Sequence, residues 1–200
     1  MVKVYFAPPG VGKSSLCARI AFWEHIRKKL HLNNYDRVYC NFPLKHTYLF
    51  EKSDLGVFSF GEGKNLILID EAGIEFYGRQ YKNMPQHQIN FFKLARHYKC
   101  DIFLFSQSFD IDKSIRDLAP ELRYIKKCTL LPHHVKALRI HKSIMVEEQQ
   151  HQLIDGYEFD PLLTRIFSTR RYYLPFYWHM FDSWDTPDLP EKPSGFKHYG

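Results

Sequence analysis

The segment at residues 7–14, Ala-Pro-Pro-Gly-Val-Gly-Lys-Ser, constrains the fold of this chain more than any other. An apolar run at residues 2–6 precedes it, and residues 14–30 follow it with apolar side chains at helical spacing. A buried strand, a loop ending in Gly-Lys-Ser and a helix, in that order, are the context of a phosphate-binding P-loop. Ala7 stands where the motif has its first glycine, and the alternative interpretation is a plain Gly/Pro turn before an ordinary helix.

The residue types of this loop predict what it binds. Glycines allow backbone N–H groups to turn toward a phosphate, and the positive N-terminal end of the helix adds to the attraction. Lys13 is expected to contact the β- and γ-phosphates of ATP, and the Ser14 hydroxyl is a candidate ligand for Mg²⁺. Pro8 and Pro9 carry no N–H and cannot contribute donors. The expected phosphate cradle consists of Gly10, Val11, Gly12, Lys13, Ser14 and Ser15.

A second acidic motif supports hydrolysis as well as binding. Residues 66–69 form an uninterrupted apolar run that predicts a core strand, and Asp70 and Glu71 follow it directly. Asp70 is expected to bind Mg²⁺ together with Ser14 and the phosphates, or to accept a hydrogen bond from a water on the metal. Glu71 is expected to orient or deprotonate the attacking water. The alternative is an acidic turn that only ends a strand.

The order of apolar runs and helical patterns predicts the fold class. Strands are expected at 2–6, 37–41, 66–69, 102–105 and 121–130, and helices at 14–30, 86–98 and 112–118. Buried strands that alternate with helices favour a mostly parallel central sheet flanked by helices, and together with the P-loop they predict an α/β P-loop NTPase. Ligands of such sheets bind at the carboxyl ends of strands, where Gln107 also lies. Gln107 could bond the attacking water or the γ-phosphate, or could be a simple turn residue.

Arginines near the Gln107 strand are candidates for stabilising the charge of a transition state. Arg96 precedes that strand, and Arg116 and Arg123 follow it. Any of them could reach a nucleotide in its own subunit or in a neighbouring one, as arginine fingers do. A surface role is the alternative for each of them.

Composition and charge narrow the class of protein. The hydrophobic fraction of 44% and the charged fraction of 25% are typical of a globular domain, and the net charge of +6 favours anionic partners. The four cysteines are far apart and read as reduced core residues. We expect no signal peptide and no membrane-spanning run. Residues 1–184 are expected to form one domain, followed by a proline-rich, loosely ordered tail at 185–200.

Together these motifs resemble the zonular occludens toxin-like (Zot) family, which includes the gene-I assembly ATPases of filamentous phages and is similar to the FtsK/HerA motors. The resemblance covers residues 1 to about 185. It rests on Pro-Gly-x-Gly-Lys-Ser at 9–14, Val-Tyr-Cys-Asn-Phe-Pro at 38–43, Leu-Ile-Asp-Glu-Ala at 68–72 and Ala-Arg-His-Tyr-Lys-Cys-Asp-Ile at 95–102. Ser-Gln at 106–107, Ile-Asp-Lys-Ser-Ile-Arg at 111–116 and Phe-Asp-Ser at 181–183 complete the series.

The resemblance implies a P-loop NTPase fold of the ASCE, FtsK/HerA-like kind. It also implies an ATP-driven motor for assembly and export of filamentous phage virions, on the cytoplasmic side of the host inner membrane. It implies a homo-oligomer, for which a ring is one arrangement. It also implies phage coat or membrane assembly proteins as partners. Two alternatives stay open. One is a DNA-translocating or genome-packaging ATPase stimulated by DNA, including single-stranded DNA; the other is a nucleotide-gated adaptor that recruits coat protein or the membrane surface.

Overall fold

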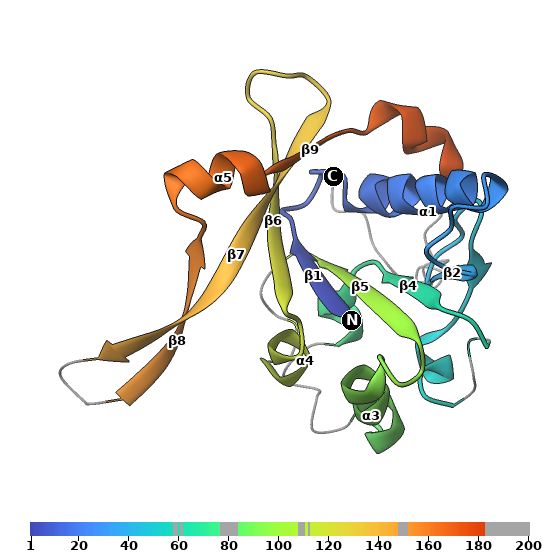
Figure 1. Cartoon of the computed structure of the whole chain (residues 1–200), viewed down its shortest axis with the longest axis horizontal. Coiled ribbons are helices and arrows are strands. Elements are labelled where there is room, and N and C mark those ends of the chain that lie inside the picture. Colours follow the sequence, from blue (N-terminus) through green and yellow to red (C-terminus); the bar gives the residue numbers. More distant parts are fainter. Residues whose placement is uncertain are drawn as a thin grey trace, which may run out of the picture.

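In the computed structural model, the described residues form one mixed sheet of nine strands. Figure 1 shows how the strands and helices are arranged. The structure describes residues 1–57, 60, 62–76, 84–107, 111, 113–147 and 152–182. The strands are β1 (Val2–Phe6), β2 (Arg37–Cys40), β3 (Tyr48–Leu49), β4 (Asn65–Ile69), β5 (Cys100–Ser106), β6 (Glu121–Lys127), β7 (His134–Glu147), β8 (Gln152–Phe159) and β9 (Arg170–Tyr173). The α-helices are α1 (Lys13–Lys29), α2 (Ala72–Glu75), α3 (Gln86–Leu94), α4 (Lys113–Asp117) and α5 (Leu162–Ser168), and η1 (Lys52–Asp54) and η3 (Pro175–Met180) are 3₁₀ turns.

The parallel part of the sheet has the order β3-β2-β4-β5-β1-β6. All residues of β4 and β5 are buried, as expected for apolar strands that are covered on both faces. This part confirms the expected α/β fold with a mostly parallel sheet. Strand β5 lies between β4 and β1, so the two strands that carry the predicted acidic and phosphate-binding motifs are one strand apart.

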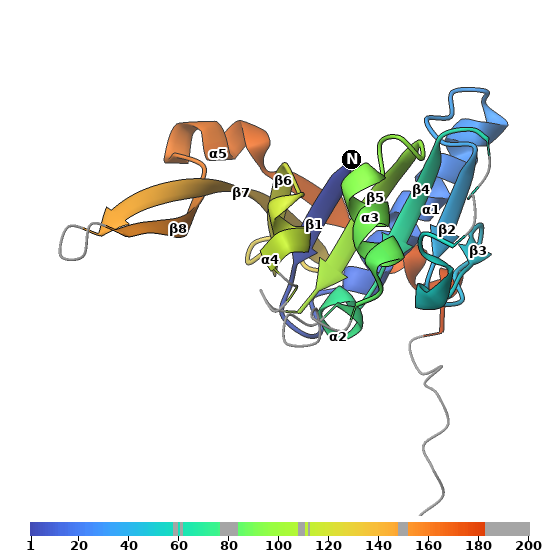
Figure 2. The same ribbon diagram turned by 90° about the horizontal axis from the view of Figure 1, so that it is seen from below.

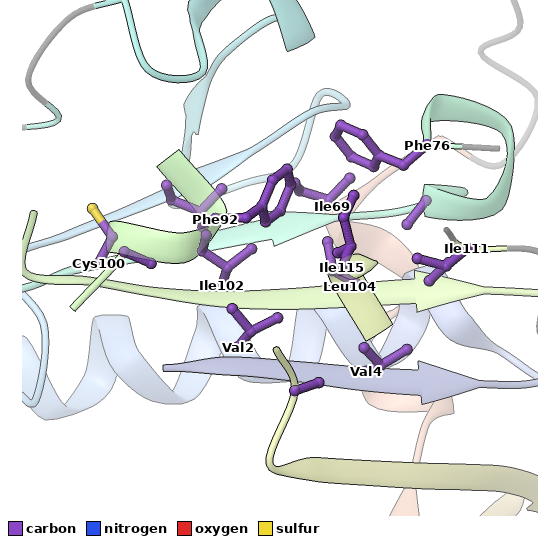
Figure 3. Close-up of a cluster of buried hydrophobic side chains, with 14 of the residues drawn as sticks. Val2, Val4, Ile69, Phe76, Phe92, Cys100, Ile102, Leu104, Ile111 and Ile115 are labelled. Atoms are coloured by element: carbon purple, nitrogen blue, oxygen red, sulfur yellow. The ribbon is translucent and has the colours of Figure 1, made fainter. Parts of the chain in front are cut away.

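Helices cover the two faces of the sheet in separate layers. Helix α1 and the η3 turn lie on one face, and α2, α3 and α4 lie on the other (Figures 1 and 2). The layer of α2, α3 and α4 packs on the sheet through apolar side chains. Phe92 of α3 and Ile115 of α4 lie in one buried cluster with Val4, Ile102 and their neighbours in the strands (Figure 3). These two packed layers hold the carboxyl ends of β1, β4 and β5 at one edge of the sheet.

The last third of the chain adds an antiparallel extension that the sequence prediction did not contain. Strand β7 pairs with β6 through its first half and with β8 through its second half, and β9 pairs with the beginning of β7. The β7–β8 ribbon extends away from the rest of the molecule, and α5 lies beside it (Figures 1 and 2). In β7, buried Val135 and Ala137 alternate with the more exposed His134 and Lys136, which is the pattern of a half-exposed strand and lacks the continuous apolar run of the core strands.

Most of the expected elements are present with small shifts at their ends. The helix expected at 86–98 ends at Leu94, and the strand expected at 121–130 ends at Lys127. The expected tail at 185–200, and therefore the domain boundary at 184, lie outside the described residues. Within the described part of the chain, no helix is both long and apolar enough to span a bilayer.

Candidate functional site

The loop after β1 has the backbone geometry of a phosphate cradle. Ala7 is fully buried, and its N–H donates to the carbonyl of Ser106 at 2.9 Å, so this residue continues the sheet toward β5. Its φ is not positive, which explains why alanine is accepted where the motif has glycine. Gly10 and Gly12 have φ values of 69° and 102°, a conformation that favours glycine. Gly10 and Gly12 therefore make the turn of the predicted P-loop.

Gly12 also begins the helix that follows. It is the N-cap of α1 and supplies no side-chain hydrogen bond to the first turn, which contains no acidic residue. The N–H groups at the start of α1 thus keep their capacity to bind an anion at the positive end of the helix. A Cβ on Gly12 would lie 2.6 Å from Cδ1 of Leu174, so any other residue here would need both an uncommon backbone conformation and a shift of the Leu174 side chain.

Lys13, Glu71 and Gln107 come together at this edge from three different elements. Lys13 is 7% exposed, and its Nζ lies 3.4 Å from Oε1 of Glu71. Gln107 Nε2 donates to both carboxylate oxygens of Glu71 at 2.9 Å. The ammonium of the P-loop lysine is therefore already held against a carboxylate that a phosphate could replace, and the side chain of Glu71 is oriented by an amide.

Ser14 and Asp70 form the second half of the cluster. The Ser14 hydroxyl donates to Oδ2 of Asp70, whose side chain is almost completely buried. Burial raises the pKa of Asp70 above its ordinary value, against the opposing effect of hydrogen bonds from Ser14 and from the N–H of Glu71. A buried carboxylate beside a hydroxyl is a set of hard oxygen donors, and a divalent cation would offset the desolvation of the charge. These two residues therefore fit the Mg²⁺ ligands expected from the sequence.

Asn41, at the end of β2, holds the Asp70 backbone and was missed by the sequence analysis. Its Nδ2 donates to the carbonyl of Asp70 at 2.9 Å, and its Oδ1 accepts from the N–H of Asp70 at 2.8 Å. The side chain thus imitates a neighbouring strand just beyond the end of β2. The available signal resembled the one that identified Gln107, because Asn41 is a polar residue at the end of an expected apolar strand.

The segment after Asp70 is tightly constrained. Glu71 has a φ of 51°, an uncommon conformation for a residue with a side chain, and it caps α2. A Cβ on Gly73 would lie 2.5 Å from Oγ of Ser106, so α2 packs closely on the end of β5. This close approach places the carboxylate of Glu71 in front of Gln107.

The candidate arginines lie elsewhere. Arg96 follows α3 and precedes β5, at the edge of the sheet opposite the P-loop; at about 3.3 Å per residue, the seven residues of β5 separate the two edges by roughly 20 Å. Arg116 of α4 places its guanidinium 5.3 Å from the ring centroid of Tyr157 in the β7–β8 ribbon. Arg123 is buried, with Nε donating to Glu121 at 2.5 Å. The structure thus does not bring these side chains to the P-loop of the same chain.

Comparisons with known proteins give one family match and similar solved structures. The family model for zonular occludens toxin (Zot) matches residues 44–157, and no curated protein matches the sequence at a significant level. The N-terminal domain of zonular occludens toxin from Neisseria meningitidis aligns with a TM-score of 0.59 and 16% identity, over 90% of this chain and 98% of that one. The genome packaging NTPase B204 from Sulfolobus turreted icosahedral virus 2, in complex with ATP-gammaS, aligns with a TM-score of 0.49 and 12% identity, over 78% of this chain and 95% of that one.

The solved Zot domain shares the P-loop NTPase fold described above, with its central sheet and flanking helices. Because the family match covers more than half of the 200 residues, this protein belongs to the zonular occludens toxin (Zot) family.

Proposed function

We propose that this chain is a P-loop ATPase that hydrolyses ATP to ADP and phosphate. The observation that carries the proposal is the meeting of Lys13, Ser14, Asp70, Glu71 and Gln107 at one edge of the sheet. A loop that only bound a nucleotide would not need a carboxylate and an amide in front of its lysine.

The residues of the cluster divide the work as follows. The N–H groups of residues 10–15 bind the phosphates, and Lys13 exchanges Glu71 for the γ-phosphate. Mg²⁺ held by Ser14 and Asp70 would neutralise charge on the β- and γ-phosphates. Glu71, released by the lysine and still bonded to Gln107, orients a water and accepts its proton as the water attacks.

Two variants test this assignment directly. Lys13→Ala should abolish ATP binding because the cation that contacts the phosphates is lost. Glu71→Gln should keep ATP binding but lower turnover by about 100-fold or more, since it removes the base. Lys126→Ala and Glu62→Gln, at exposed positions, are the matched controls. Unchanged turnover in both site variants would show that the assigned site is wrong.

We further propose that the enzyme is a motor for assembly and export of filamentous phage virions, on the cytoplasmic side of the inner membrane. Membership of the Zot family supports this role. A genome-packaging or DNA-translocating ATPase is an equally suitable alternative, and the net charge of +6 supports contact with DNA. Single- or double-stranded DNA that stimulates hydrolysis, with binding that weakens steeply as salt rises, would favour the alternative. Stimulation by phage coat or membrane assembly proteins alone would favour virion assembly.

We also propose that the active form is a homo-oligomer. Arg96 and Arg116 lie far from the P-loop of their own chain, so as arginine fingers they could act only on the nucleotide of a second copy. An exposed apolar surface on α5 supports self-association, because such patches mark contact sites. Its side chains are between 62% and 90% exposed: Leu162, Leu163, Ile166 and Phe167.

A further inference from the structure

We propose that a pocket beside the P-loop binds the purine base of the nucleotide, an inference that rests on the proposed ATPase function. The pocket has a volume of about 470 Å³, within the usual range for small-molecule sites. Its walls come from the P-loop, the end of β6, the β6–β7 turn and the chain after β9. They are formed by Gly10, Val11, Gly12, Lys127, Cys128, Pro132, His133, His134, Val135, Leu174 and Trp178.

The pocket is continuous with the phosphate cradle. Gly10 and Gly12 form one of its walls while their loop forms the cradle. Leu174 is buried and packs against Gly12, so a residue that lines the pocket also contacts the loop that forms the cradle. The chain that leaves β9 continues into the η3 turn, which packs on α1 (Figure 1), and the β6–β7 turn is hydrogen-bonded to that chain through His133 and Leu174. A nucleotide whose phosphates occupy the cradle can therefore place its base in this pocket without any rearrangement of the sheet.

The far wall offers a surface for stacking. The rings of His133 and Trp178 are in contact at 5.9 Å between centroids and 81° between planes, and Trp178 is 52% exposed. A half-exposed indole that lines a pocket presents part of its ring surface to it, and bases stack well on aromatic side chains. Purines present the larger stacking area, which favours ATP or GTP over CTP.

The wall is also braced in place. The N–H of Leu174 donates to the carbonyl of His133 at 3.3 Å, and the N–H of Cys128 donates to the carbonyl of His134 at 2.8 Å. His133 has a φ of 59°, which turns the chain sharply at this point. The turn that carries His133 is therefore fixed both to the segment that carries Trp178 and to the end of β6. Such preorganisation lowers the cost of ordering a binding surface.

The test compares binding of ATP, CTP and inorganic tripolyphosphate by calorimetry, which does not depend on turnover. Wild-type protein should bind ATP about 10-fold or more tightly than tripolyphosphate, and more tightly than CTP. Trp178→Leu should weaken ATP binding by about 10-fold and leave tripolyphosphate binding unchanged. Phe176→Leu, on the same η3 turn and 54% exposed, is the matched control and should change neither.

The outcomes separate this inference from the proposed function. Equal affinity of the wild type for ATP and tripolyphosphate, with loss of both in Lys13→Ala, would overturn the base site and leave the phosphate site standing. A parallel loss of ATP and tripolyphosphate affinity in Trp178→Leu would also overturn it, because the indole would then only support the loop. If the wild type bound none of ATP, CTP and tripolyphosphate, both the base site and the ATPase assignment would be overturned.

Discussion

At the scale of single residues, the two glycines of the P-loop, Gly10 and Gly12, differ in the space that is available for a side chain. Both have positive φ, but a Cβ on Gly12 would meet Leu174, whereas a Cβ on Gly10 would meet nothing within 4 Å. Gly10→Ala should therefore cost only the conformational term, about 1–2 kcal/mol. Gly12→Ala should cost about 1 kcal/mol more, because the buried Leu174 must shift. Urea unfolding of the two variants checks this difference, and equal costs would show that Leu174 moves freely.

A second prediction concerns Asn41, which bonds both peptide groups of Asp70. Asn41→Ala should lower kcat by about 10-fold, since the carboxylate loses its fixed position, while ATP binding without Mg²⁺ should change little. It should also lower the free energy of unfolding by about 1–3 kcal/mol through the unpaired backbone groups. Steady-state kinetics measure the effect on kcat separately from the effect on the free energy of unfolding. Asn33→Ala, at an exposed position, is the control. A kcat equal to that of the wild type would leave Asn41 with a structural role only.

At the scale of elements, the opposite edge of the sheet is tied together by Asp101 of β5. Its carboxylate accepts from the amino group of Met1 at 2.6 Å and from the Tyr35 hydroxyl at 2.8 Å, and Lys64 lies 3.1 Å away. One side chain thus joins the beginnings of β1 and β5 to the loops before β2 and β4. Burial acts to raise the pKa of Asp101, but these donors outweigh it and lower the pKa below the ordinary value of 3.8.

A lowered pKa in the folded state means that Asp101 stabilises the protein above about pH 4 and loses this effect as the pH falls through the lower, folded-state pKa. Asp101→Asn should lower Tm at pH 7 by about 3–6 °C, from a loss of about 1–2 kcal/mol. The difference between variant and wild type should shrink below pH 4. Calorimetric melting from pH 3 to 7 checks this, with Asp117→Asn, which removes a more exposed pair with Lys142, as a milder control. A constant difference in Tm over this range would rule out the carboxylate charge as the cause.

At the scale of the whole molecule, binding of ATP with Mg²⁺ should raise the free energy of unfolding. ATP with Mg²⁺ at about 100 times its Kd should stabilise the fold by about 2.7 kcal/mol and raise Tm by roughly 5–10 °C. EDTA should remove most of this shift, because Ser14 and Asp70 then hold no metal against the phosphates. Lys13→Ala should remove all of it. Differential scanning fluorimetry measures both, and an EDTA-resistant shift would speak against a metal at this site.

Self-association is a separate prediction at this scale. Mass measurement in solution should show a larger species with ATP and Mg²⁺ than without, if a second copy covers α5. Phe167→Ser should reduce that species, since the Phe167 side chain is 90% exposed and apolar. Val57→Ser, 66% exposed but outside α5, should not. A single monomeric mass under all conditions would contradict the homo-oligomer.

The predictive reach of the sequence differed between parts of this molecule. The apolar runs of β1, β4 and β5 and the polar residues that follow them were identified because short-range patterns specify buried strands and their ends. The ribbon of β7 and β8 was missed because the apolar residues of β7 are interleaved with histidines, lysines and an arginine, and those of β8 with a glycine and with acidic and amide side chains. Arg96 was grouped with the site because it is near Gln107 in sequence, whereas the length of β5 places it at the far edge.

The sequence by itself determined the P-loop, the acidic motif and the class of fold, because glycine conformations, helix starts and strand burial depend on neighbouring residues. Only the tertiary structure decided which of these parts meet. The order β4-β5-β1 brings Glu71 and Gln107 to Lys13, and β2 brings Asn41 to Asp70. The physical reason is that strand order and register follow from burial shared among residues far apart in the chain, which no local pattern records.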